Sequence, residues 1–184
     1  MKLKSVFLET LTASAVYVAA FFMTFEILMP VQAMFFPDFS SSASLLFLPH
    51  GVRVLSAWLL GWRSVYALLP GVFLTYYLLA GDGVFTASRL SGIAISVLTA
   101  PTVFFLAAKL GFDARLRSNI APCWPCVMIV GIIAGIIGGI LTNMAFGSPL
   151  LDYFAFFIGD TSGLFFLMLG LMLLFRAERA RSPR

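Results

Sequence analysis

Seven ionisable or hydrogen-bonding residues interrupt the apolar stretches of this 184-residue sequence, and they are its best candidates for chemistry. A charged side chain is costly inside a bilayer, so it usually faces the protein interior or a water-filled cavity. We therefore predict that these residues bind a ligand, most simply a small anion: His50, Arg53, Asp160, Glu26, Arg89, Tyr76 and Asn143.

The positions of these residues along their stretches favour one side of the membrane. At the rise of an α-helix, Arg53 and Asp160 both lie about 12 to 14 Å from the outer ends of their stretches, and the other five also lie toward the outer side. We therefore predict a pocket that opens to the outer leaflet. Because Arg53 and Asp160 carry opposite charges at similar depth, we also predict that they pair.

The segment Leu48-Pro-His-Gly-Val-Arg53 is the most informative part of the sequence. Pro49 suits the first turn of a helix and disfavours helical geometry at the residue before it, so a helix should begin near Pro49. From there to Trp62 the helix is only about 21 Å long, which is too short to span a bilayer. Either the preceding residues continue it past a kink, or they form a re-entrant segment.

A re-entrant segment would leave a helix N-terminus inside the membrane, with His50 and Arg53 one turn apart. Such a terminus is a recurrent anion-binding arrangement in transporters. Two other hypotheses stay open at this point. Arg53 and Asp160 could form an ion pair that serves packing alone, or His50 and Asp160 could relay protons.

The composition excludes several classes of protein. Hydrophobic residues make up 61% of the chain and charged residues 11%, against about 25% charged in soluble proteins. The 12 Lys and Arg residues are scattered, which argues against nucleic-acid binding. Because no nucleophile elbow, phosphate-binding loop or zinc-protease helix occurs, we predict that the chain is not an enzyme and needs no metal or cofactor.

Six apolar stretches are long enough to cross a bilayer core of about 30 Å as helices. They lack the alternation typical of membrane β-barrels, so the predicted fold class is all-α. We expect a six-helix transmembrane domain over residues 1–175 and a short basic tail over residues 176–184. The predicted spans are Val6–Met29, Leu45–Trp62, Ser64–Ala80, Arg89–Lys109, Cys126–Phe146 and Tyr153–Phe175.

The distribution of basic residues predicts the orientation. With both termini inside, ten of the 12 Lys and Arg residues lie on the inner surface, and only Arg53 and Arg89 lie in the outer half. A cleaved signal peptide ending near Ala33 is the alternative for the first stretch. The length of that stretch and Glu9 near its start favour a true span.

Glycines and cysteines suggest helix contacts and a turn. Gly159 and Gly163 in the last stretch, and the stripe of Gly131, Gly135 and Gly139 in the fifth, should allow neighbouring helices to approach closely, within one chain or in a dimer.

The Cys-Trp-Pro-Cys segment at 123–126 should be a turn that enters a helix. Because we place it at the reducing inner side, a disulfide is not expected.

The segment LFLPHGVRVLSAWLLGWRSVYALLPGVFL resembles the bacterial membrane-associated sensor (MASE-type) domain, and FIGDTSGLFFL resembles a Gly-Asp-x-x-Gly segment of that family. The resemblance implies a sensor in the bacterial cytoplasmic (inner) membrane. The family usually precedes an output domain, and none is expected here, so a signal would pass to a separate partner. The matching residues are Pro49, Gly51, Gly61, Arg63, Pro70, Gly71, Gly159, Asp160 and Gly163.

A second resemblance is to the substrate-binding S components of energy-coupling-factor transporters. These proteins are of similar length, with an outward pocket, and Ala15-Val-Tyr-Val-Ala19 is similar to the Ala-x-x-x-Ala contact of their first helix. That resemblance implies a separate transporter subunit as partner. A membrane assembly or scaffold subunit, in contact with the lipid bilayer alone and with polar residues that serve packing, is the third alternative.

Overall fold

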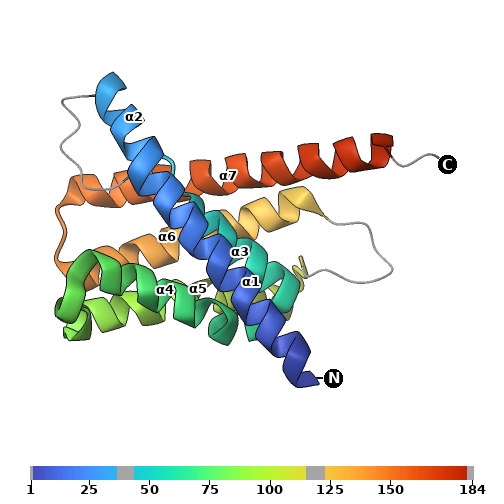
Figure 1. Ribbon diagram of the computed structural model, residues 1–184, viewed down its shortest axis with the longest axis horizontal. Coiled ribbons are helices and arrows are strands. Elements are labelled where there is room, and N and C mark those ends of the chain that lie inside the picture. Colours follow the sequence, from blue (N-terminus) through green and yellow to red (C-terminus); the bar gives the residue numbers. More distant parts are fainter. Residues whose placement is uncertain (1, 37–43, 115–122, 182–184) are drawn as a thin grey trace.

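The computed structural model describes residues 2–36, 44–114 and 123–181, and its regular elements are all helices (Figure 1). Helix α1 (Lys2–Phe22), the π-helical turn η1 (Met23–Leu28) and α2 (Met29–Phe35) follow one another without a break. Pro30 lies just after the π-helical turn. Because proline has no N–H group for the carbonyl four residues earlier, regular α-helical bonding is interrupted there.

The remaining elements follow in a simple order. They are α3 (Leu48–Leu60), α4 (Arg63–Ala80), the short 3-10 turn η2 (Gly81–Phe85), α5 (Ala87–Lys109), α6 (Trp124–Phe146) and α7 (Leu150–Arg181). Among the described residues, five helical segments are long and apolar enough to cross a membrane. The chain is therefore a polytopic membrane protein, as its composition predicts. The five segments are Lys4–Phe35, Arg63–Phe85, Ala87–Lys109, Trp124–Phe146 and Leu150–Leu174.

The predicted second span, Leu45–Trp62, is wrong as a membrane-length helix. Helix α3 has 13 residues, about 20 Å at helical rise, and residues 45–47 before it are not helical. The structure thus excludes a helix that continues through Leu48 past a kink. Phe47, directly before α3, has non-helical backbone angles (φ −100°, ψ 87°), and Pro49 lies in the first turn of the helix, where its missing N–H group costs no hydrogen bond.

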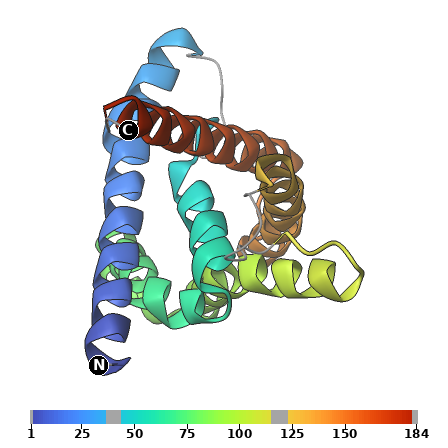
Figure 2. The ribbon, with the colours of Figure 1, turned by 90° about the vertical axis from the view of Figure 1, so that its right-hand side faces the viewer.

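Helix α3 forms the centre of the bundle. It contacts α1, α4, α5, α6 and α7, and Figure 2 shows it surrounded by them. In Figure 1, α4 to α7 run roughly along one direction while α1 crosses them diagonally. Both termini lie at one end of the bundle, and the α4–α5 and α6–α7 turns lie at the other.

Glycines allow α7 to touch the chain at the start of α3. A methyl group on Gly163 would overlap the carbonyl oxygen of Phe47, and one on Gly159 would overlap that of Ser44. The Phe47 N–H group donates a hydrogen bond to the Gly159 carbonyl at 2.9 Å. The close approach predicted at Gly159 and Gly163 occurs, but the nearest neighbour is the non-helical backbone that leads into α3 rather than another helix.

The glycine stripe of α6 also packs within the chain. Gly131 faces Val54 of α3 and Leu164 of α7, and Gly135 faces His50 and Asp160 on the same two helices. Side chains from α3 and α7 therefore occupy the space that the glycines leave open.

A serine joins α1 to α4 where Pro70 interrupts the bonding of α4. The Ser14 hydroxyl donates to the Ala67 carbonyl at 2.8 Å and accepts from the Gly71 N–H group at 3.0 Å. Gly71 has no side chain to keep Ser14 away, since a methyl group there would lie 2.8 Å from the Ser14 carbonyl oxygen.

The expectation that Cys123 and Cys126 remain unbonded is wrong, because the structure joins them in a disulfide. Cys123 directly precedes α6 and Cys126 lies in its first turn, which brings the two Cα atoms to 5.2 Å. That separation suits a disulfide. The prediction relied on the reducing character of a compartment and gave the geometry no weight.

Candidate ligand-binding site

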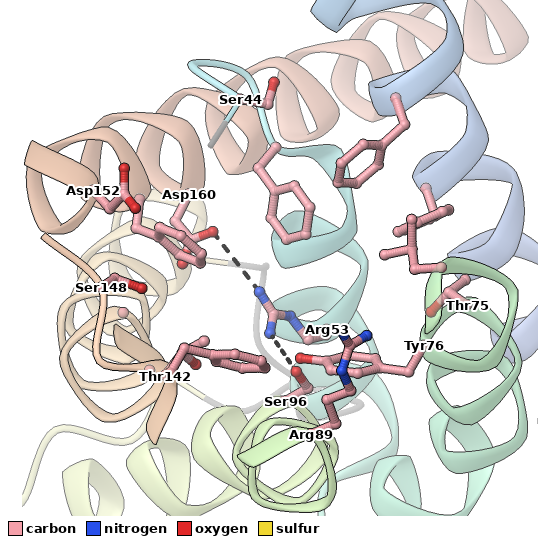
Figure 3. A pocket seen from close by; sticks show the side chains of 18 of the residues that line it. Ser44, Arg53, Thr75, Tyr76, Arg89, Ser96, Thr142, Ser148, Asp152 and Asp160 are labelled. Carbon is pink, nitrogen blue, oxygen red and sulfur yellow. Dashed lines mark hydrogen bonds and ion pairs between the residues drawn. The ribbon is translucent and has the colours of Figure 1, made fainter. Parts of the chain in front are cut away.

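A pocket of about 340 Å³ lies between the helices, toward the end of the bundle that holds the α4–α5 and α6–α7 turns (Figure 3). Side chains from α1, α3, α4, α5, α6 and α7 line it, together with η1 and the residues before α3 and α7. Four of the seven predicted site residues belong to this lining: Arg53, Tyr76, Arg89 and Asp160. These four residues come from four of the six predicted spans and meet at one pocket wall.

Arg53 and Asp160 form the predicted ion pair. Arg53 Nη2 lies 3.8 Å from Asp160 Oδ1, and the two side chains are 14% and 4% exposed. The other terminal nitrogen, Nη1, donates to the Ser96 hydroxyl at 3.2 Å, and the guanidinium carbon lies 5.6 Å from the centre of the Phe47 ring. Contacts to α5, α7 and Phe47 thus hold the guanidinium at the pocket wall (Figure 3).

His50 lies behind this pair, outside the large pocket. Its Nδ1 is 3.3 Å from Asp160 Oδ2 and 3.4 Å from Arg53 Nη2, and its Nε2 is 3.0 Å from the Gly131 carbonyl oxygen. Gly135 makes this arrangement possible, because a methyl group there would lie 3.2 Å from the Asp160 side chain and 3.3 Å from His50 Nε2. The three ionisable groups form one buried cluster across α3 and α7.

The hydrogen bonding of the cluster is incomplete. Within the described part of the chain, the buried atoms Arg53 Nε and Asp160 Oδ1 have no hydrogen-bond partner. The contact between the two side chains is therefore an ion pair at 3.8 Å without a close hydrogen bond. Arg53 is consequently able to engage another anionic group.

The N-terminus of α3 is not an open anion site. The Leu48 N–H group donates to the Thr24 hydroxyl at 3.3 Å, and the His50 N–H group bonds to the Phe47 carbonyl at 3.3 Å. Thr24 itself is fully buried and donates to the Ala20 carbonyl. The N-terminus of α3 lies inside the bundle, as the re-entrant alternative requires, but the Thr24 hydroxyl of η1 already accepts a hydrogen bond from its first N–H group.

A second cation, Arg89, lines the same pocket as Arg53. Arg89, in the first turn of α5, is half-buried, and among the described residues it forms no ion pair. Tyr76 of α4 comes close to the same helix because Gly92 has no side chain, and a methyl group there would lie 2.7 Å from the tyrosine hydroxyl. Figure 3 shows Arg53, Tyr76 and Arg89 pointing into one space.

Aromatic side chains supply much of the remaining wall. Apart from Tyr17 and Tyr76, five phenylalanines line the pocket: Phe21, Phe25, Phe47, Phe146 and Phe156. Small polar side chains lie among them, from Ser44, Thr75, Thr142 and Ser148. Such a wall suits a ligand with an apolar or aromatic body and few polar groups.

Two predicted site residues lie elsewhere. Glu26 is exposed on the outer surface of η1 and does not line the pocket. Asn143 is fully buried, donates to the Gly139 carbonyl at 2.8 Å within its own helix, and has no partner for Oδ1 among the described residues. Sequence reasoning placed both by depth alone, and depth does not say toward which neighbour a helical side chain points.

Sequence reasoning also missed Asp152 and the aromatic wall. Asp152 is buried and lines the pocket near the start of α7, yet it precedes the predicted sixth span. The 20 phenylalanines of the chain are too numerous to single out five. Only the packing of α1, α6 and α7 around α3 selects them.

Comparison with models of known protein families, with curated proteins and with solved structures gives no match for this chain. The comparisons therefore identify no family, and the two family resemblances seen in the sequence rest on their short motifs alone. The fold and composition show a helical protein with five membrane-length apolar helices in the part of the chain that the structure describes.

Proposed function

We propose that this protein binds a small organic anion within the membrane, in the pocket between Arg53 and Arg89. One observation carries the proposal: two arginines line a cavity of about 340 Å³ whose other walls are largely aromatic. This volume falls in the usual range for small-molecule sites, which is about 300 to 1,000 Å³. An aromatic carboxylate has the matching chemistry.

The charges of the lining support an anion over a cation. Arg89 forms no ion pair within the described part of the chain, and Arg53 is held only at 3.8 Å from its acidic partner. Guanidinium groups bind carboxylates through strong paired hydrogen bonds. The nearby Tyr76 hydroxyl adds a further donor.

In this proposal the pocket opens to the outer side of a bacterial inner membrane, with both termini inside. The distribution of basic residues supports that orientation. Ligand binding would serve either a sensor that signals through a separate partner or the substrate-binding component of a transporter. Reporter fusions at both termini and after Asp38 test the orientation, and an external C-terminus would contradict it.

Binding is tested with benzoate and its neutral counterpart benzamide on the full chain in lipid nanodiscs. Benzoate should raise the unfolding temperature and benzamide should not, because only the carboxylate engages the arginines. Charge-assisted hydrogen bonds contribute about 1.5 to 3 kcal/mol, so Arg89→Gln should weaken benzoate binding roughly 10-fold to 100-fold. Lys109→Gln removes the same charge at the opposite, exposed end of α5 and serves as the matched control.

Failure of benzoate and of other aromatic carboxylates to bind would contradict the proposal. Equal stabilisation by benzamide would point to a neutral ligand and would remove the role assigned to the arginines.

A further inference from the structure

Asp160 and His50, the buried partners of Arg53, suggest that the pocket takes up a proton when it binds an anion. Asp160 has two polar neighbours within the described residues, Arg53 at 3.8 Å and His50 at 3.3 Å. An anion that binds Arg53 draws the guanidinium away from Asp160. His50 is then the neighbour left to stabilise the buried carboxylate.

The hydrogen bonds of His50 determine where a proton can bind. The Gly131 carbonyl oxygen can only accept a hydrogen bond, so His50 Nε2, at 3.0 Å from it, carries a hydrogen. In the neutral ring Nδ1 is then unprotonated; it accepts a hydrogen bond from Arg53 Nη2 at 3.4 Å and also lies 3.3 Å from Asp160 Oδ2. When Arg53 turns to an anion, Nδ1 loses this donor. The lone pairs of Nδ1 and Oδ2, 3.3 Å apart, then repel each other unless a proton lies between them, so the two atoms form a site for one proton.

The charge balance of the pocket requires such a proton once an anion is bound. The ionisable groups that line the pocket around His50 and Asp160 come from five helices: Arg53 on α3, Arg89 on α5, Asp152 on α7, Tyr17 on α1 and Tyr76 on α4. Helix α6, which also packs against His50 and Asp160, contributes the Gly131 carbonyl instead. The formal charges of the two arginines and two aspartates cancel. A bound anion adds one negative charge to a site where unbalanced charge is costly.

We propose that each organic anion binds together with one proton, which is held between His50 Nδ1 and Asp160 Oδ2. The anion and the proton both come from the solution that the pocket faces, and no covalent bond forms or breaks. This inference rests on the proposed function, because it assumes an anion at Arg53. The inference adds that anion binding in this pocket is coupled to the uptake of one proton.

The experiment measures proton uptake during benzoate binding to the full chain in nanodiscs. Calorimetric titration in buffers of different ionisation enthalpy gives the number of protons taken up, which should be about one per benzoate. By linkage, benzoate affinity should then fall about tenfold for each unit rise in pH wherever the free pair is unprotonated.

Asp160→Asn tests where the proton binds. The amide cannot take up the proton and adds no negative charge, so benzoate should still bind, without proton uptake and with an affinity independent of pH. Should this variant fail to fold, His50→Gln provides a second test, because the carboxylate alone must then take the proton and the pH dependence moves to lower pH. Asp82→Asn makes the same change at an exposed residue of η2 and should behave as wild type.

The outcomes separate this inference from the proposed function. Binding of benzoate without proton uptake, at every pH tested, would overturn the inference and leave anion binding intact. Proton uptake that persists in Asp160→Asn would also overturn it, since the proton would then bind elsewhere. Failure of aromatic carboxylates to bind would overturn both.

Discussion

Replacing Gly163 by alanine should destabilise the protein, because α7 contacts the backbone that leads into α3 at this residue. The added methyl group would overlap the Phe47 carbonyl oxygen and lie 2.9 Å from the Leu48 nitrogen. Both neighbours are backbone atoms, so no flexible side chain can move aside. The Phe47 N–H group is also bonded to Gly159, which prevents a simple displacement of the segment.

The expected cost follows from overpacking. Extra methyl groups in well-packed interiors cost about 1 to 3 kcal/mol, and an overlap with backbone belongs at the upper end of that range. A stability change of 1 kcal/mol moves the unfolding temperature of a protein this size by roughly 2 to 4 °C. Gly163→Ala should therefore lower the unfolding temperature by about 6 to 12 °C.

Gly170→Ala is the matched control on the same helix. A methyl group there meets nothing within 4 Å, and alanine favours helix over glycine by about 0.5 to 1 kcal/mol. Thermal unfolding of both variants in the same detergent should give changes of opposite sign. If Gly163→Ala were as stable as wild type, the close contact between α7 and the start of α3 would be refuted, and with it the placement of Arg53.

Three further results are expected. Arg53→Ala and Asp160→Ala should each lower the unfolding temperature, and the double variant should recover much of the loss, because breaking a buried pair costs more than removing both members. Additive losses in the double variant would contradict the coupling of the two residues. Ser14→Ala should lower the free energy of unfolding by about 1 to 3 kcal/mol in denaturation experiments, because two backbone groups of α4 lose the hydroxyl that bonds them. An unchanged free energy of unfolding would refute this bridging role of Ser14. Cys126→Ser should cost at most about 2 kcal/mol, since the disulfide closes a very short loop, and reductant should then no longer shift the melting temperature.

The sequence alone determined the class of the protein and the start of its central helix. Long apolar stretches with so few charged residues cannot form a soluble fold, so the membrane-spanning helices follow from composition and length. Pro49 predicted the start of α3, because proline is favoured in the first turn of a helix, where its missing N–H group costs no hydrogen bond. The opposite charges of Arg53 and Asp160, at similar depth, predicted their ion pair because unpaired charges are costly in lipid.

The tertiary structure alone decided which polar residues meet. Glu26 and Arg89 both lie toward the predicted outer side, but only Arg89 lines the pocket, because the direction of a helical side chain depends on how its helix packs against the others. The N-terminus of α3 was likewise not predictable from sequence, since the Thr24 hydroxyl, from a distant part of the chain, accepts the hydrogen bond of the Leu48 N–H group there. The role of His50 likewise depends on Gly131 and Asp160, which two other helices bring to its opposite ring nitrogens. Such contacts join residues far apart in sequence, and no local pattern encodes them.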